Sequence, residues 1–393
     1  MSFSLGSVSY LMFSVFIIVA VGYALGRITI KGVSLGTAGV FIVALLYGAF
    51  FGEHFSSQLL IAETSYASQA LKIVENLGLV FFVTSVGFIA GPNFFKNLKK
   101  NFKSYAFLGL IIIIAGGLSA VGCIFIGRAI EGANTGFDPK ELTAMIVGLL
   151  SGSLTSTPAF SAAKETVLPQ YQDAVTVGHG IAYLFGVIGV VLFVQLIPKF
   201  SHANMEEERK KITIVDTGAK KKAPEKLIEM DEFGFILVGS VKFFNFFSLT
   251  TTGGTLLVSL IFGHFGHCGK INIVPSKAVL NTFRELGLMI FLIGAGVAGG
   301  MSFVKYFKAI YFVYGIVMTV VPMIVGFFIA KYVLKMSLLN NLGSITGGMT
   351  STPALGTLIN VAGTDDVASA YAATYPVALI AVVLISQFLI ILF

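Results

Sequence analysis

The chain has 393 residues, of which 56% are hydrophobic and only 11% charged. A soluble domain carries about 25% charged residues, so this composition excludes a soluble globular protein and indicates a membrane protein. The net charge is +7, but basic residues of a membrane protein first report its topology, and we therefore expect no nucleic-acid partner.

Apolar stretches long enough to cross a bilayer recur along the chain. Residues 9–26, 107–127 and 375–393 reach or approach the ~20 residues that span a ~30 Å hydrocarbon layer. The first stretch has no basic segment before it and no evident cleavage site after it, so we expect it to be retained as a span. The sequence thus predicts an all-α polytopic membrane protein in contact with the lipid bilayer.

Two polar segments interrupt this pattern, GLLSGSLTSTPAF at 148–160 and GSITGGMTSTPAL at 343–355. Inside a bilayer, broken helix is tolerated only where it is buried in protein or lines a watery cavity. Each segment carries glycines that allow close backbone approach and a proline that disfavours helix at the residue before it. The residues expected to shape these segments, without binding substrate, are Gly152, Pro158, Gly347, Gly348 and Pro353.

The hydroxyl groups of these segments can cap freed helix ends or bind a ligand, and two helix amino ends would favour an anion. The alternative is a pair of proline kinks packed through the GxxxG spacings at 148–152 and 343–347. Because the segment occurs twice, we favour a ligand site. The candidate substrate-binding residues in it are Ser153, Thr155, Ser156, Thr157, Thr350, Ser351 and Thr352.

A charge-dense stretch at 199–232 separates two membrane halves, and its balanced Lys, Arg, Asp and Glu content predicts a solvated linker. We therefore divide the chain into a first membrane repeat at 1–198, the linker at 199–232 and a second membrane repeat at 233–393.

The two halves match in blocks that keep their order. LGLVFFVTSVGFIAGPNFF from Leu77 matches LGLMIFLIGAGVAGGMSFV from Leu286 at an offset of 209, and the Thr-Ser-Thr-Pro segments match at 195. Residues from Ala182 match those from Thr374 at 192, and 39–48 match 254–263 at 215. Ordered matches that keep glycine and proline indicate an internal duplication.

Loop charges predict the orientation. With the amino terminus outside, Arg27, Lys31 and the lysines of 96–103 fall inside, and a re-entrant hairpin at 148–160 leaves the linker in the cytoplasm, as the positive-inside tendency requires. Each half then has about five spans plus one re-entrant helical hairpin, the second half is inverted, and both termini lie outside. Inverted repeats are a common plan of secondary transporters. One weak point is 233–247, which is short for a crossing.

The doubled segments, the Gly-x-x-x-Gly-Pro pattern at 87–92 and YLFGVIG at 183–189 resemble the aspartate–alanine exchanger family of bacterial antiporters. The resemblance covers nearly all of the membrane part. It implies an elevator-like exchanger of small carboxylates, such as aspartate, alanine or succinate, in the bacterial inner membrane, and we expect a homodimer. Family members usually carry two cytosolic regulatory domains between the halves, which this chain lacks. Thr84 and Leu184 also depart from the family pattern, which leaves the substrate pair open.

Arg284 is the candidate cation for an anionic substrate, with an interfacial topology anchor as the alternative. It occupies the position of Glu75 in the first half, so a Glu75–Arg284 pair is a further alternative. We expect Lys164 and Glu165 to be solvated or to form a local pair. His179 could relay a proton or bond an adjacent helix.

No nucleophile, base and orienting residue form a catalytic set, so we expect no enzyme and no cofactor. HFGHC at 264–268 is a weak metal signal, and we assign no metal. The sequence therefore predicts a secondary transporter that exchanges small carboxylates or amino acids by alternating access. The alternatives are a sodium- or proton-coupled symporter and a gated anion channel.

Overall fold

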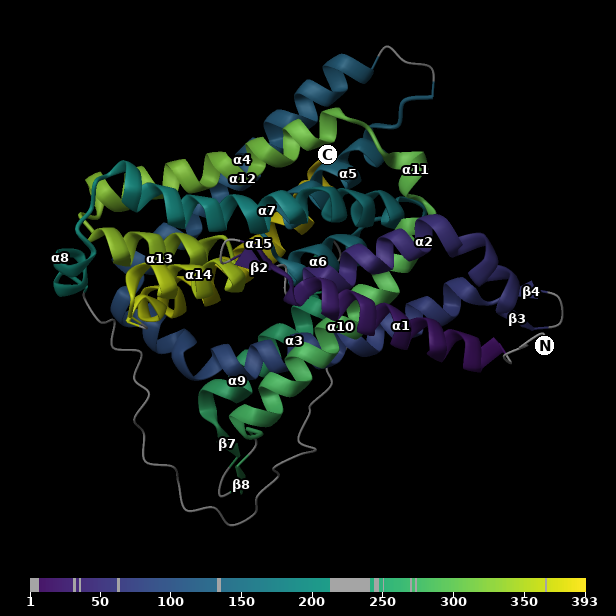
Figure 1. Cartoon of the computed structure of the whole chain (residues 1–393), viewed down its shortest axis with the longest axis horizontal. Helices are drawn as coiled ribbons and strands as arrows, with labels where there is room; N and C mark the ends of the chain where they lie inside the picture. Colours follow the sequence, from purple (N-terminus) through teal and green to yellow (C-terminus); the bar gives the residue numbers. More distant parts are fainter. Residues whose placement is uncertain are drawn as a thin grey trace.

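The computed structural model describes residues 7–30, 33–34, 37–61, 64–132, 136–212, 241–243, 247–249, 251–268, 271–272, 274–364 and 366–393. This part of the chain is built from helices (Figure 1). Those of the first half are α1 (Ser7–Arg27), α2 (Ala38–Gln58), α3 (Ala67–Asn101), α4 (Phe107–Glu131), α5 (Pro139–Ser153), α6 (Thr157–Thr166) and α7 (Gln172–Phe200). After α8 (Met205–Lys210) come α9 (Thr251–Phe265), α10 (Lys277–Met301), α11 (Phe303–Tyr306), α12 (Ile310–Phe328), α13 (Leu338–Gly348), α14 (Thr352–Ala362) and α15 (Val367–Leu392).

Strands occur in the described residues only as four short antiparallel pairs at turns between helices. They are β1 (Thr29–Ile30) with β2 (Val33–Ser34), β3 (Leu60–Ile61) with β4 (Thr64–Ser65), β5 (Val241–Phe243) with β6 (Phe247–Leu249), and β7 (His267–Cys268) with β8 (Ile271–Asn272). Short π-helical turns precede α4 at Phe102–Ala106 and follow α12 at Ile329–Val333, and a 3-10 turn, Pro169–Tyr171, leads into α7.

Eight helices in the described residues are long and apolar enough to cross a membrane, which confirms the predicted multi-pass helical protein. Five of them, α1 to α4 and α7, precede the linker, and three, α10, α12 and α15, follow it. Helix α9 is apolar but shorter. The doubtful span at 233–247 lies largely outside the described residues, and its described part belongs to the β5–β6 turn.

The helices pack as two groups (Figure 1). Helices α1, α2, α3, α9 and α10 pack mainly on one another and form what we call the α3 bundle. Helices α4 to α7 and α12 to α15 form the second group, the hairpin bundle, which contains both Thr-Ser-Thr-Pro segments. The bundles meet where α6, α7 and α15 face α2, α3, α9 and α10, so the Thr-Ser-Thr-Pro segments lie beside a boundary between two separately packed units.

Glycines that match between the halves make matching contacts in the α3 bundle. A side chain at Gly78 would come 2.6 Å from the carbonyl oxygen of Gly287, and one at Gly287 would come 2.7 Å from that of Gly78. Gly91 packs against α9 and Gly300 packs in the same way against α2, the helix that matches α9. Close backbone approach through small residues is how membrane helices associate without a hydrophobic driving force between them.

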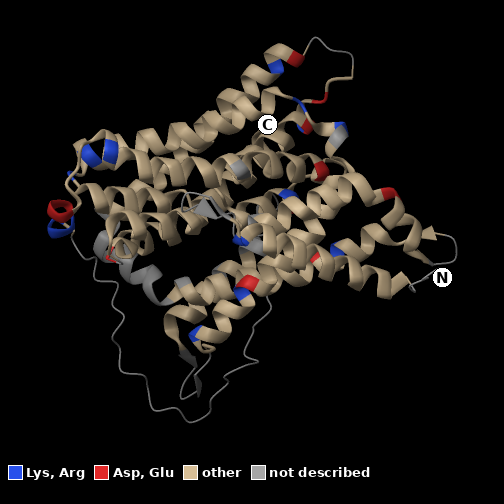
Figure 2. Ribbon diagram, in the orientation of Figure 1, with Lys and Arg blue, Asp and Glu red and all other residues tan. Residues whose placement is uncertain are grey.

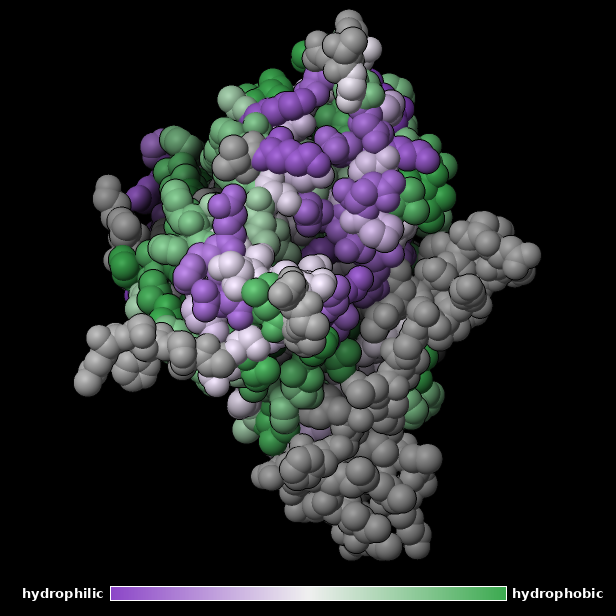
Figure 3. Space-filling model, turned by 90° about the vertical axis from the view of Figure 1, so that its right-hand side faces the viewer, coloured by the Kyte–Doolittle hydropathy of each residue, from purple (hydrophilic) through white to green (hydrophobic). Residues whose placement is uncertain are grey.

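Polar and apolar surfaces are segregated as a bilayer requires. In Figure 2 the charged residues of the hairpin bundle lie mainly at its two ends, with uncharged helix between them. Figure 3 views the end that carries α11 and the start of α5, where hydrophilic residues gather and apolar residues surround them. Exposed phenylalanines such as Phe16 and Phe50 cover the sides of α1 and α2, as expected for surfaces in lipid.

Candidate functional site

The first Thr-Ser-Thr-Pro segment is a helical hairpin formed by α5 and α6. Asp138 caps α5 by accepting a hydrogen bond from the Lys140 backbone N–H at 2.9 Å. The helix ends at Ser153, and α6 begins four residues later at Thr157, capped by Ser156. Pro158 lies in the first turn of α6, where its missing N–H costs nothing. The segment is therefore a break between two helices and not a kink within one continuous helix.

The second segment repeats this arrangement in α13 and α14, with Pro353 in the first turn of α14. Both turns contain a threonine with a positive φ, 50° at Thr155 and 51° at Thr350. A β-branched residue rarely adopts this conformation, and such strain persists only where the surroundings enforce it. The two hairpin tips are thus strained at matched positions.

The hairpin tips hold each other through reciprocal hydrogen bonds. The Thr155 hydroxyl donates to the carbonyl oxygen of Met349 at 2.9 Å, and the Thr350 hydroxyl donates to that of Leu154 at 2.8 Å. Both threonines are buried, each 7% exposed. Because each hydroxyl satisfies a backbone carbonyl that the opposite turn leaves without a helical partner, these bonds fix the tips against each other.

Close backbone contacts seat each hairpin on the helix that follows it. A side chain at Gly152 would lie 2.8 Å from the Tyr183 nitrogen of α7, and one at Gly347 would lie 2.7 Å from the Tyr371 carbonyl oxygen of α15. Gly348 faces a different helix, since its added side chain would lie 2.5 Å from Ile112 of α4. The three glycines predicted as structural therefore permit packing that a larger residue would block.

The two hairpins open at opposite ends of α7. At its start, the Tyr171 hydroxyl donates to the Asp138 carboxylate at 2.6 Å, which places the beginning of α5 beside the residues that follow α6. This hydrogen bond holds the pKa of Asp138 below its usual range. The carboxylate is therefore ionised at neutral pH and anchors the open end of the first hairpin.

Beyond the other end of α7, α8 contacts both ends of the second hairpin. Glu208 accepts a hydrogen bond from the Leu338 backbone N–H at 3.3 Å, and Arg209 donates to the Ala362 carbonyl oxygen at 2.6 Å. The acid thus meets a helix amino end and the base a helix carboxyl end, the arrangement that the helix dipoles favour. Helix α7 has 29 residues, about 43 Å at 1.5 Å per residue, and this length separates the two open ends.

The hydroxyls of the first hairpin are enclosed. Ser153 donates to the Gly315 carbonyl oxygen on α12 at 3.0 Å, Ser156 caps α6, and Thr157 is buried. Phe160 of α6 packs on Phe291 of α10 with the ring centroids 5.5 Å apart. In this conformation the first hairpin therefore offers no exposed surface for a ligand at these residues.

The second hairpin is open on the outer face of α14. Thr352 is exposed, and its hydroxyl lies 3.3 Å from that of Tyr371. A side chain built at Gly356 meets nothing within 4 Å. Ser351, unlike Ser156, does not cap its helix, and its buried oxygen has no hydrogen-bond partner within the described part of the chain. The amino end of α14 thus has donors that a bound anion could use.

Arg284 of α10 lies near this open face. Its guanidinium interacts electrostatically with the hydroxyls of Tyr371 and Tyr375, whose rings stack with centroids 5.2 Å apart. Its ion pair is with the adjacent Glu285 at 3.6 Å, and the Arg284 side chain is 34% exposed. The structure thus brings Thr352 into contact with Tyr371 and places Arg284 within electrostatic range of Tyr371 and Tyr375, two tyrosines that were not among the predicted binding residues.

Glu75 pairs with Lys164 of α6 at 2.8 Å, so the alternative Glu75–Arg284 pair is wrong. The same contact shows that Lys164 is neither solvated nor paired locally with Glu165. Sequence spacing could not reveal this pair, because the two residues are 89 positions apart and on helices of different bundles.

His179 is fully buried behind the first hairpin tip. Its ring stacks on Phe160 with centroids 4.3 Å apart, and Nδ1 lies 2.9 Å from the Ser151 hydroxyl. Ser151 donates its single proton to the Gly148 carbonyl oxygen at 2.7 Å, so Nδ1 carries the imidazole proton and donates to Ser151. Nε2 then keeps a lone pair with no hydrogen-bond partner within the described residues.

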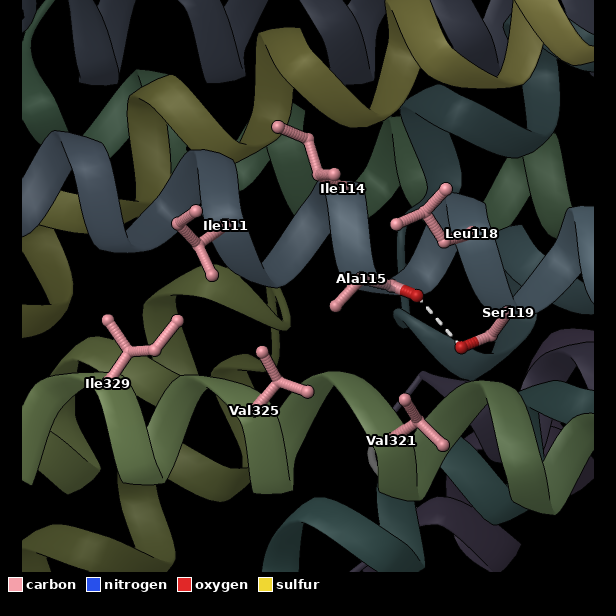
Figure 4. Close-up of a pocket in the computed structure, with 8 residues that line it drawn as sticks. All are labelled: Ile111, Ile114, Ala115, Leu118, Ser119, Val321, Val325 and Ile329. Atoms are coloured by element: carbon pink, nitrogen blue, oxygen red, sulfur yellow. Dashed lines mark hydrogen bonds between the residues drawn. The ribbon is translucent and has the colours of Figure 1, made fainter.

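The possible metal site and an apolar groove both concern parts of the chain away from the hairpins. Within the described part of the chain, no three His, Cys, Asp or Glu side chains are grouped as a metal site requires. The side chains of His267 and Cys268 fall outside that part. A groove of about 490 Å³ runs between α4 and α12, and Figure 4 shows its aliphatic lining, with Ser119 turned back to the Ala115 carbonyl oxygen. This lining suits lipid chains and not a carboxylate.

Comparison with known proteins assigns the chain to a family. A transporter of Bacteroides thetaiotaomicron described as uncharacterized is 26% identical, with 95% of this chain and 97% of the relative aligned. A second, from Desulfotalea psychrophila, is 23% identical over 96% of both chains. A third, from Geobacter sulfurreducens, is 32% identical over 52% of this chain and 34% of its own length. The first alignment extends over 546 positions, more than the 393 residues present here, so that relative carries stretches that this chain lacks.

The family model described as a predicted permease membrane region matches residues 14–199 and 233–391. The unmatched interval coincides with the predicted linker. With both membrane halves matched, the chain belongs to the aspartate–alanine exchanger family of permeases.

Proposed function

We propose that this protein is a secondary transporter that exchanges small carboxylates or amino acids, such as aspartate for alanine, by alternating access. The observation that carries the proposal is the pair of hairpins, which open at opposite ends of α7, meet at their tips and differ in exposure. One central site reached from one side at a time is what alternating access requires. Family membership and the transporter names of the relatives support the same class.

In this proposal the carboxylate binds at the amino end of α14. The free Ser351 hydroxyl, the Thr352 and Tyr371 hydroxyls and the Arg284 guanidinium supply donors and positive charge. Hydrogen bonds between charged groups contribute about 1.5–3 kcal/mol, so Arg284 is the largest single contribution in this set. The hydroxyls of Thr155 and Thr350 hold the tips together, that of Ser153 bonds α12 and that of Ser156 caps α6, so none of the four contacts substrate in this state. Thr157 would contact substrate only in the opposite state, when the first hairpin is open.

The membrane halves are inverted repeats in this proposal, and each hairpin is re-entrant. Matched glycine contacts in the α3 bundle and matched hydrogen bonds at the tips support a pseudo-twofold relation between the halves. Basic residues gather at the end where the second hairpin opens, and because such residues favour the cytoplasmic side they support a cytoplasmic location for the linker. These residues are Lys199, Arg209, Lys331 and Lys335. The open side would then be cytoplasmic, with both termini outside and the inner membrane as the location. The homodimer stays a prediction.

Transport would proceed by movement of the hairpin bundle against the α3 bundle. The two units pack mainly within themselves, which supports a rigid displacement of one along the other. Exchange follows if the empty hairpin bundle crosses slowly because its anion-binding donors lack a partner. The α3 bundle would provide the static part of the elevator.

A proton-coupled symporter is the second candidate, and His179 favours it. A neutral imidazole with an unpartnered lone pair in a sealed site would accept a proton once water reaches it. Coupling then predicts that a proton gradient drives uptake into vesicles without internal substrate. Replacing His179 with asparagine would remove that uptake and leave counter-exchange in place.

Thiol labelling of Thr352→Cys tests the proposed site in a protein whose own cysteines are replaced by Cys123→Ala and Cys268→Ser. We expect a membrane-impermeant reagent to label it from the linker side, because Thr352 is exposed and, in this proposal, the second hairpin opens toward that side. Aspartate or succinate at about ten times its Kd should slow labelling about tenfold by mass action. Ser201→Cys, exposed at the same end, is the control that substrate should not protect. Labelling of Thr352→Cys at an equal rate from both sides would contradict the proposal.

A further inference from the structure

The Glu75–Lys164 ion pair joins the two bundles on the closed side of the site. The Lys164 ammonium donates to both carboxylate oxygens of Glu75, at 2.9 and 2.8 Å. The side chains are 9% and 13% exposed. Glu75 belongs to α3 and Lys164 to the last turn of α6, so displacement of the hairpin bundle along α3 would separate them. Breaking a buried pair leaves an uncompensated charge, which makes this contact costly to open.

The pair lies on the route to the first hairpin tip. The Lys164 ammonium is 6.0 Å from the centroid of the Phe160 ring, and that ring is stacked on His179 beside the tip. Phe41 of α2 and Phe291 of α10 close the same region from the α3 bundle. A substrate entering from the first hairpin's side would therefore pass Lys164 before it reached Thr157.

In the part of the chain that the structure describes, no ion pair between the bundles occurs at the matched positions of the open side. The offset of 195 places Ile359 at the position of Lys164, and the offset of 209 places Arg284 at that of Glu75. The closed side thus holds a cation and an internal carboxylate together, whereas the open side has a cation on α10 facing no carboxylate-bearing position on α14. Among the described residues, Arg284 on the open side pairs at 3.6 Å with the exposed Glu285 of its own helix, whereas the Lys164–Glu75 pair is largely buried and joins the two bundles.

We propose that Lys164 is a substrate-carboxylate-binding residue used when the first hairpin is open, and that Glu75 occupies it otherwise and holds that side closed. The inference rests on the proposed transport function. As the bundles separate, Lys164 loses Glu75 and a substrate carboxylate takes its place, so that the ammonium keeps an anionic partner in both states. Small carboxylates are the class that can make the two hydrogen bonds that Glu75 makes here.

Exchanging the charges of Glu75 and Lys164 separates the role of the pair in closing the first hairpin from the role of Lys164 in binding substrate. The reporter is Thr157→Cys, buried in this state, in the protein without its natural cysteines, labelled from the first hairpin's side. We expect Glu75→Gln to raise the labelling rate at least about tenfold, because the closed state loses a buried ion pair. The double variant Glu75→Lys, Lys164→Glu should restore protection but should not restore substrate affinity from that side, because a carboxylate at position 164 repels the substrate. Glu53→Gln, exposed on α2, is the matched control and should change neither quantity.

The outcomes are distinct. Unchanged labelling in Glu75→Gln overturns the closing role, and recovery of both protection and affinity in the reversed pair overturns the binding role. If Glu75→Gln does not fold, the neutral pair Glu75→Gln, Lys164→Met carries the test, and it too should label faster than the parent. The labelling assay does not depend on transport. If the parent protein fails to exchange carboxylates, the proposed function is wrong, but the labelling rates still test whether Glu75 holds the first hairpin closed.

Discussion

Replacing Arg284 with glutamine is expected to lower the affinity for a carboxylate substrate by about 10- to 100-fold, since a charge-assisted hydrogen bond contributes about 1.5–3 kcal/mol. Glutamine keeps much of the length and a donor but removes the charge that acts on the Tyr371 and Tyr375 hydroxyls. Its weak pair with the exposed Glu285 contributes little to stability, so the variant should fold normally. The measurement is equilibrium binding of labelled aspartate or succinate to the purified protein.

The control for this variant is Lys277→Gln, which removes a positive charge from the exposed first turn of the same helix, two turns away. It should leave affinity within about twofold, because an exposed charge at this distance is largely screened. Equal losses of substrate affinity in Arg284→Gln and Lys277→Gln would indicate that α10 contributes only a general positive field. Unchanged affinity in Arg284→Gln would return Arg284 to the role of an interfacial topology anchor.

The double variant Thr155→Val, Thr350→Val is expected to lose more stability than either single variant but less than the sum of the two, each single substitution costing about 1–3 kcal/mol because it leaves a buried carbonyl oxygen without its donor. Valine keeps the β-branched shape at a positive φ, so backbone strain remains while the compensating hydrogen bond is lost. Thermal unfolding in detergent measures the effect. The two single variants complete a double-mutant cycle, and because the bonds join the same two turns, the losses should not add.

Ser119→Ala is the matched control for the threonine variants. Its hydroxyl also donates to a backbone carbonyl, that of Ala115 at 2.8 Å, but within one helix beside the aliphatic groove of Figure 4. Its removal should change stability by less than about 0.5 kcal/mol, since the carbonyl keeps its helical bond. If the stability losses of Thr155→Val and Thr350→Val are additive and neither is larger than that of Ser119→Ala, the two hairpin tips do not depend on each other for stability.

Much of the architecture follows from local features of the sequence. Apolar length identified the spans, and the paired Thr-Ser-Thr-Pro segments identified both helix breaks, with the glycines before them in close contact with α7 and α15. Matched blocks also predicted which helices correspond, and Gly78 and Gly287, 209 positions apart in the chain, contact each other. Periodicity and small residues are local properties, so they can be read without knowing what packs against them.

The division of labour among the candidate residues could not be read from the sequence. Thr155 and Thr350 lie in identical Thr-Ser-Thr-Pro motifs and bond backbone of the opposite hairpin, whereas Thr157 and Thr352, also matched, differ in exposure because only the first hairpin is sealed in this conformation. The packing around each hairpin, and not the motif, sets that difference. One feature of the sequence points to the Tyr371–Thr352 contact, namely the four-residue spacing that places Tyr371 and Tyr375 on one face of the last helix. The Glu75–Lys164 pair had none, since it depends on how the bundles pack.

Counter-exchange in proteoliposomes tests the central claim most directly. Vesicles loaded with alanine, aspartate, succinate or nothing would be given labelled aspartate outside, with and without sodium or proton gradients. We predict rapid uptake only into vesicles that contain a carboxylate or amino acid to be exchanged, with no effect of either gradient and no macroscopic conductance. Uptake into empty vesicles at the same rate would contradict exchange, and a conductance without internal substrate would place the protein among anion channels.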